Sequence, residues 1–233
     1  MVNKEKLRLL DNKNLKKDIL NQVIKSPVFS NVNSLLRMQQ IYEAGIKEIQ
    51  TKLEILDSEF KVKFDHNPIH HIESRLKKPE SIIKKAIDKD ITLTEKEIMN
   101  HIHDIAGIRV ICNYIDDVYV VAQLLIDQDD IRLIKIKDYI QNPKPNGYRS
   151  LHLVLEVPIF LAEGAQPIHV EVQLRTIAMD FWASLEHRLR YKTENNVPED
   201  IKDELIQCAI DISELDHKMQ NIYNRLNHGQ RNQ

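Results

Sequence analysis

Residues 168 to 175 alternate strictly between apolar and polar side chains. The aliphatic members are Ile168, Val170, Val172 and Leu174, and the polar members are His169, Glu171, Gln173 and Arg175. Because successive side chains of a strand point to opposite faces, this pattern predicts a β-strand with one buried and one polar face. The rest of the chain must therefore supply a hydrophobic core for the first face and either solvent or a binding site for the second.

Helix and strand patterns are interspersed along the rest of the chain. The predicted helices cover residues 4–25, 33–56, 94–103, 116–126, 176–182 and 199–226, with a short one that begins at Pro79. The predicted strands cover residues 69–76, 105–111, 131–140, 151–157 and 168–175, and a connector around Gly164 separates the last two. This order predicts an α+β fold, in which helices flank a mixed five-stranded β-sheet and long helices stand at both ends.

The last predicted helix carries a heptad stripe of apolar residues at alternating steps of four and three. The stripe comprises Ile201, Leu205, Cys208, Ile212, Leu215, Met219, Ile222 and Leu226. It can pack on the 33–56 helix or on another subunit, and we expect assembly because two striped helices exceed what a five-stranded sheet needs. We therefore divide the chain into N-terminal packing or oligomerisation helices (1–60), a central domain (61–195) and a C-terminal oligomerisation helix (196–233).

Composition argues against several classes of partner. The formal charge is −2 over 233 residues, so no overall positive charge draws the chain to DNA or to a membrane, and any basic site must be local. Apolar runs are short, so we expect neither a secretory signal nor a membrane span. Cys112 and Cys208 are far apart and form no metal-like pair, and we expect a cytoplasmic protein.

A basic loop joins two of the predicted strands. Residues 141–147 contain two prolines and an Asn-Gly pair, which are typical of a turn. The cations around this bend are Lys135, Lys137, Lys144, Arg149 and His152, with Tyr148 among them. Cations with one aromatic ring suit a phosphorylated ligand that carries a flat base, and the alternative is a solvated hairpin tip.

Two acidic residues stand among these cations if the strands share one sheet. Asp104 precedes one predicted strand, and Glu171 lies on the polar face of another. Mg²⁺ bound to phosphates typically takes one or two carboxylates, so the pair favours phosphoryl-type transfer, which needs charge neutralisation and positioning. The alternatives are an Asp104–Arg109 pair with no further role, and Lys84 and Lys85 on the solvent face of a helix.

Other metal and phosphate motifs are weak or absent from the sequence. His70, His71, His101 and His103 have no third metal partner at a typical spacing. The dipeptide His103-Asp104 is similar to the metal ligands of His-Asp phosphohydrolases, which need a helix where this chain has a strand. No glycine-rich phosphate loop is present, so side chains must hold any nucleotide.

Taken together, five segments resemble the RelA/SpoT-type alarmone synthetases, and specifically the small, synthetase-only members. They are residues 103–109 (HDIAGIR), 137–140 (KDYI), 146–152 (NGYRSLH), 170–176 (VEVQLRT) and 179–187 (MDFWASLEH). The resemblance implies a nucleotidyltransferase-like fold and transfer of pyrophosphate from ATP to the ribose 3′-hydroxyl of GDP or GTP. Its products would be AMP and (p)ppGpp, with no built-in degradation.

The resemblance also assigns the ATP side of a site. It implies that adenine stacks between the guanidinium planes of Arg75 and Arg109, a cation–π arrangement. It further implies that Lys77, Ser81 and Lys85 hold the ATP phosphates.

For the catalytic and acceptor sides, the resemblance implies that Asp104 binds Mg²⁺. Glu171 would help to bind the metal and would orient or deprotonate the attacking 3′-hydroxyl. Tyr148 would stack on guanine, and Asp180 would accept hydrogen bonds from its N1–H and amino group. The other implied acceptor-site residues are Lys137, Lys144, Asn146, Arg149, His152, Gln173 and Arg175.

The partners expected on this basis are ATP and GDP or GTP, with a homo-oligomer, specifically a tetramer. Two other functions stay open. One is an inactive module that binds guanine nucleotide or single-stranded RNA through the basic loop. The other is a related nucleotidyltransferase with a different acceptor. The presence of both Asp104 and Glu171 favours the enzyme, because a pure binder does not need two desolvated acids beside phosphates.

Overall fold

The computed structural model describes residues 32–192 and 197–230, and its centre is a five-stranded sheet. The strands are β1 (Ile69–Leu76), β2 (Ala106–Cys112), β3 (Arg132–Asp138), β4 (Leu151–Leu161) and β5 (Gly164–Thr176), in the spatial order β1-β2-β5-β4-β3. β2 and β5 pair in parallel, and the other neighbours are antiparallel. The mixed sheet of the α+β prediction is therefore confirmed, whereas the predicted helix at residues 4–25 lies outside the described residues.

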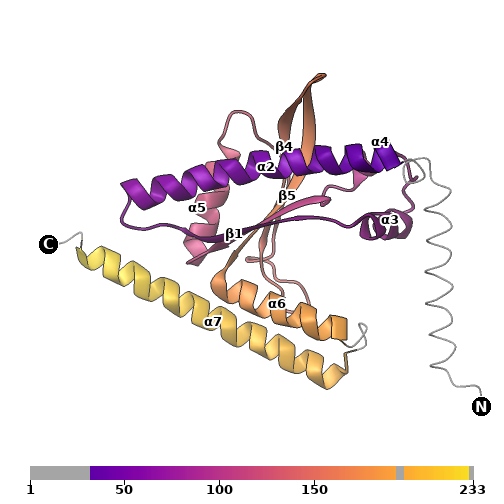
Figure 1. Ribbon diagram of the computed structural model, residues 1–233. Coiled ribbons are helices and arrows are strands. Elements are labelled where there is room, and N and C mark those ends of the chain that lie inside the picture. The colour runs from indigo at the N-terminus through magenta and orange to yellow at the C-terminus, as the bar shows by residue number, and fades with distance from the viewer. Residues whose placement is uncertain (1–31, 193–196, 231–233) are drawn as a thin grey trace, which may run out of the picture.

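Helices surround this sheet. They are α2 (Val32–Lys63), α3 (Pro79–Asp88), α4 (Glu95–His101), α5 (Ile115–Ile126), α6 (Ile177–Lys192) and α7 (Glu199–Gln230). Figure 1 shows α2 running across the sheet, and α6 and α7 side by side beyond the end of β5, which agrees with the contacts of α2 with four strands and of α6 with α7. Among the described helices, none has both the length and the apolar character needed to cross a membrane.

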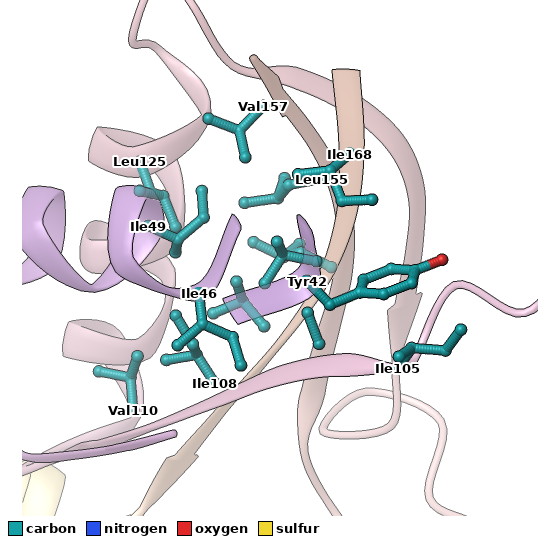
Figure 2. Packing of buried hydrophobic residues seen from close by; sticks show 14 of the residues in the cluster. Tyr42, Ile46, Ile49, Ile105, Ile108, Val110, Leu125, Leu155, Val157 and Ile168 are labelled. Carbon is teal, nitrogen blue, oxygen red and sulfur yellow. The ribbon is translucent and has the colours of Figure 1, made fainter. Parts of the chain in front are cut away.

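The buried face of the sheet packs on α2 and α5. Figure 2 shows Tyr42, Ile46 and Ile49 of α2 among aliphatic side chains of β2, β4, β5 and α5, and all of them belong to one buried cluster. Gly45 allows this close packing, because a Cβ at this position would lie 2.6 Å from Cγ2 of Ile168. The apolar half of the 168–175 alternation thus supplies the core, as predicted.

Several boundaries differ from the sequence prediction, and α6 in particular continues ten residues beyond the predicted end at residue 182. α2 continues to Lys63, beyond the predicted break, because its exposed last turns are held by ion pairs four residues apart, such as Lys61–Asp57 at 2.6 Å. α4 ends at His101, two residues early. The predicted connector is instead part of a long hairpin, in which β4 and β5 stay paired from Leu151 to a turn before Gly164, whose φ of 121° suits glycine.

α7 turns most of its heptad stripe away from the subunit. Its main contacts are with α6 and α5, so the alternative in which the stripe packs on α2 is not the arrangement found. The inward side instead carries Ala209, Asp216 and Gln220, and Asp216 accepts a 2.6 Å hydrogen bond from the Thr176 hydroxyl. Stripe residues such as Leu215, 56% exposed, face outward.

Candidate active site

The polar face of the sheet brings together residues from all five strands. In one register row, Gly107 pairs with Arg75 and with Glu171, and Val154 pairs with Glu171 and Lys135. In the next row, Arg109 pairs with Glu73 and Gln173, and His152 pairs with Gln173 and Lys137. The predicted meeting of the segments around Arg109, His152 and Glu171 on one sheet is therefore confirmed.

A cleft, here called the carboxylate cleft, opens beside this polar face. It is lined by Lys85, Lys89, His101, His103, Asp104, Lys135, Lys137, His152, Val154 and Glu171. Both predicted catalytic carboxylates lie in it, with lysines contributed by a helix on one side and by an edge strand on the other. This charge distribution suits a polyanionic ligand that bridges Asp104 and Glu171.

Asp104 is held by two ammonium groups. Its Oδ2 accepts hydrogen bonds from Lys77 Nζ at 2.5 Å and Lys85 Nζ at 2.6 Å. Burial raises the pKa of Asp104, but the hydrogen bonds and charges of these lysines outweigh it, so the pKa lies below its ordinary value. Oδ1 is buried and has no hydrogen-bond partner among the described residues, which leaves one carboxylate oxygen available to a cation.

A small pocket, here called the arginine pocket, lies on the same face beside the carboxylate cleft. Arg75 and Arg109 both line it, and Gly107 pairs with Arg75 and lies two residues before Arg109 on the same strand. Arg109 Nη1 contacts Glu73 at 3.2 Å and Asp180 at 3.6 Å. The alternative in which Arg109 merely neutralises Asp104 is therefore wrong, because lysines occupy that role.

Glu171 is held by side chains of β4 and β5. Gln173 Nε2 donates to Oε2 at 2.8 Å, and His152 Nδ1 lies 3.5 Å from Oε1. Burial raises the pKa of Glu171, but His152, with help from Gln173, outweighs it, so the pKa lies below its ordinary value. Glu171 is therefore ionised at neutral pH and can accept a proton or a hydrogen bond.

Tyr148, at the base of the basic loop, is linked to this carboxylate through His152. Its hydroxyl lies 2.8 Å from His152 Nε2 and accepts a 2.6 Å bond from Arg175. Lys144 Nζ lies 4.5 Å from the centre of the Tyr148 ring. Gly147, with a φ of 87°, makes the preceding turn possible, and a side chain there would collide with α7.

Arg175 and Asp180 form an ion pair where β5 ends and α6 begins. Arg175 is 5% exposed, and its Nη1 donates to Asp180 Oδ1 at 3.1 Å. Asp180 lies in the first turn of α6 and also faces Arg109. The residues predicted to contact guanine, Tyr148 and Asp180, are therefore both bonded to Arg175.

Three predicted ligand residues lie elsewhere. Asn146 Nδ2 donates to Glu186 of α6 at 3.2 Å, and Arg149 Nη1 donates to the Ala209 carbonyl of α7 at 3.4 Å. These contacts fix the loop to the helices and do not line the carboxylate cleft or the arginine pocket. Ser81 is exposed in the first turn of α3 and lines neither of them.

Sequence reasoning missed Lys89 as a residue of the carboxylate cleft. Lys89 follows Lys85 by four residues, the spacing of neighbours on one helix face, so the signal was present. The histidines His101 and His103 line the cleft as well. Across the described ranges, no three His, Cys, Asp or Glu side chains converge as a metal-binding group.

The sequence of this chain is similar to those of known proteins. The family described as the region found in RelA / SpoT proteins matches residues 74–196. The GTP pyrophosphokinase YwaC of Bacillus subtilis (strain 168) is 48% identical over 182 residues, which are 78% of this chain and 87% of YwaC. The GTP pyrophosphokinase YjbM of the same organism is 38% identical over 181 residues, covering 78% and 84%.

The structure of this chain is also similar to solved structures of small alarmone synthetases. The small alarmone synthetase 2 of Bacillus subtilis matches with a TM-score of 0.75 and 44% identity, covering 82% of this chain and 98% of that one. The small alarmone synthetase 1 of Bacillus subtilis, bound to its product pppGpp, matches with a TM-score of 0.77 and 35% identity, covering 83% and 98%.

Proposed function

The chain belongs to the RelA/SpoT family, and from this premise we propose that it is a GTP pyrophosphokinase of the small alarmone synthetase type. It transfers the β,γ-pyrophosphate of ATP to the 3′-hydroxyl of GDP or GTP, which yields AMP and (p)ppGpp. The observation that carries this conclusion is the carboxylate cleft, where Asp104 and Glu171 lie within one lysine-lined cavity. The relatives' names and the pppGpp-bound neighbour support the same reaction.

On the ATP side, adenine stacks between Arg75 and Arg109 in the arginine pocket. Their placement on neighbouring strands, where both line one small pocket with Gly107 opposite Arg75, supports this assignment. Lys77 and Lys85 then exchange Asp104 for the phosphates, which are equally good acceptors for an ammonium group. Ser81 is left out of this set because it is exposed away from both cavities.

On the acceptor side, guanine lies against Tyr148 and Asp180, and the phosphate tail lies along Lys137 and His152. Lys144 stands over the Tyr148 ring and can reach the same tail. The 3′-hydroxyl then points at Glu171, which orients it and accepts its proton as the oxygen attacks the β-phosphorus. Asn146 and Arg149 act on this site only through the loop that they hold.

Asp104, helped by Glu171, is the proposed Mg²⁺ ligand. The unpartnered, buried Oδ1 of Asp104 fits this role, as does the preference of Mg²⁺ for one or two carboxylates plus phosphate oxygens. When bound, the ion supplies charge neutralisation on the transferred phosphates.

The subunits assemble through α7, and a tetramer is the proposed state. The outward-facing stripe, with Leu215 and Leu226 at 56% and 65% exposure, supports this arrangement. Light scattering on Leu215→Asp should show a smaller particle with an unchanged fold, because this side chain does not enter the core. An unchanged particle size would remove the stripe from the interface.

We also propose a cytoplasmic location, which the free thiols Cys112 and Cys208 support.

A nucleotide product assay tests the function. Purified protein with ATP, Mg²⁺ and GDP or GTP should release AMP and form a 3′-pyrophosphorylated guanosine, which chromatography and mass spectrometry identify. Replacement of GTP by 3′-deoxy-GTP is the matched control, because it lacks only the attacking hydroxyl. AMP release that persists with this control, or binding without turnover, would contradict the assignment.

A further inference from the structure

Four hydrogen bonds and one ion-pair contact, between His152 and Glu171, form a closed ring that includes Arg175. We propose that Arg175 is a positioning residue, which fixes the carboxylate of Glu171 through two separate chains of side-chain contacts, here called arms, and does not itself contact a nucleotide. This inference rests on the proposed function, in which Glu171 orients and deprotonates the 3′-hydroxyl. It replaces the acceptor-binding role that the sequence resemblance implies for Arg175.

The first arm runs through Tyr148 and His152. Arg175 Nη2 donates to the Tyr148 hydroxyl at 2.6 Å, and a guanidinium has no acceptor to offer in return. The hydroxyl proton is therefore directed to His152 Nε2, 2.8 Å away. With Nε2 accepting, His152 carries its proton on Nδ1, which faces Glu171 Oε1 at 3.5 Å.

The second arm is shorter and runs along β5. Arg175 Nη2 also donates to Gln173 Oε1 at 3.2 Å, which fixes the orientation of that amide. The amide then presents Nε2 to Glu171 Oε2 at 2.8 Å. Each arm thus contacts one carboxylate oxygen of Glu171, and both arms begin at Nη2 of Arg175.

Burial separates this role from ligand binding. Arg175 is 5% exposed and its other terminal nitrogen is engaged by Asp180 at 3.1 Å, so both terminal nitrogens are bonded to protein groups, and only the buried Nε has no partner among the described residues. A planar fork with several donors can hold three partners at once, whereas a lysine holds its bonds without fixed geometry. Arg175 also connects the proposed guanine contacts, Tyr148 and Asp180, to the base that acts on the ribose of the same nucleotide.

The kinetics of three variants test this ring of contacts. Tyr148→Phe keeps the aromatic side chain on which guanine stacks but breaks the first arm, and Gln173→Met breaks the second. We expect each to lower kcat roughly tenfold, the value of one lost hydrogen bond, with the KM for GTP nearly unchanged. Arg175→Lys releases both arms and should lower kcat roughly 100-fold, as for a small misplacement of a catalytic group.

The decisive measurement is the combination of variants. Adding Tyr148→Phe to Arg175→Lys should cost little more, because that arm is already released. The double variant Tyr148→Phe with Gln173→Met should reproduce the Arg175→Lys loss, and it keeps the test valid if Arg175→Lys does not fold. Arg132→Lys is the matched control, because Arg132 pairs with Glu156 on the same sheet but outside the ring, and its kcat should not change.

Two results would overturn the inference. If the costs of Arg175→Lys and Tyr148→Phe multiply, the residues act independently and there is no ring. If Tyr148→Phe raises the KM for GTP and leaves kcat unchanged, the hydroxyl binds nucleotide and does not position Glu171. Both results require an active wild-type protein, whereas a wild-type protein that forms no 3′-pyrophosphorylated product would refute the proposed function itself.

Discussion

The two carboxylates of the cleft are held in different ways. Asp104 is bonded by two ammonium groups from the segments around β1 and α3, whereas Glu171 is held by an imidazole and an amide from β4 and β5. Both have a pKa below the ordinary value, and in both cases other groups outweigh the effect of burial. The lowered pKa is thus produced by two lysines in one case and by a histidine and a glutamine of neighbouring strands in the other.

This difference matches the role that we propose for each carboxylate. The lysines at Asp104 are flexible point charges that can move to phosphates, and one oxygen of Asp104 is unpartnered among the described residues. The donors at Glu171 lie in neighbouring register positions of rigid strands and are themselves anchored by Arg175. The Asp104 half is therefore suited to exchange of partners, and the Glu171 half to a fixed orientation.

The largest expected effect comes from removing the charge of Glu171, the carboxylate that is held in a fixed orientation. Glu171→Gln keeps the shape and one acceptor oxygen, so the fold should be retained and kcat should fall roughly 1,000-fold, within the range of general-base contributions. AMP release measures the loss, and circular dichroism checks the fold. Normal turnover by this variant would show that Glu171 is not the base.

Two neighbouring lysines, Lys84 and Lys85, test the role of the ammonium groups at Asp104. Lys85→Met removes one ammonium group from Asp104 and should raise the KM for ATP roughly 30-fold, because a charge-assisted hydrogen bond to phosphate is lost. Lys84→Met, one residue away on the exposed side of α3, is the control and should have no effect. Equal effects would mean that only the general charge of α3 matters.

A smaller and more selective effect is expected at the loop. Tyr148→Ala should weaken GTP roughly tenfold, the cost of one lost stacking platform, and leave the KM for ATP unchanged. Isothermal titration with GTP and with a non-hydrolysable ATP analogue separates the two. Equal weakening of both ligands would indicate collapse of the loop and not the loss of a guanine contact.

The smallest effect is a change of stability in acid. Because the folded-state pKa of Glu171 is lowered, its carboxylate contributes stability that is present above the unfolded pKa and is lost as the pH falls through the folded value. The Tm of the wild type should therefore fall relative to that of Glu171→Gln between about pH 6 and about pH 3. A constant difference across this range would mean that the carboxylate is not stabilised by its partners.

Much of the molecule could be derived from patterns in the sequence. The alternation at 168–175 gave the central strand with its two faces, and the periodic segments gave the helices around it, because side-chain period is a local property. The boundaries were less predictable, since the last turns of α2 are held by exposed ion pairs and not by an apolar stripe. The β4–β5 hairpin likewise depended on pairing that continues past the buried segment.

The sequence by itself determined the fold class and the polar strand face, and it indicated candidate residues for binding phosphates and a base. Only the tertiary structure decided which of them are partners. It paired Asp104 with lysines in place of Arg109, turned Asn146 and Arg149 toward α6 and α7, and buried Arg175 beneath Tyr148 and Asp180. The physical reason is that a hydrogen bond depends on distances of about 3 Å between segments far apart in sequence, which register and helix packing set and no local pattern contains.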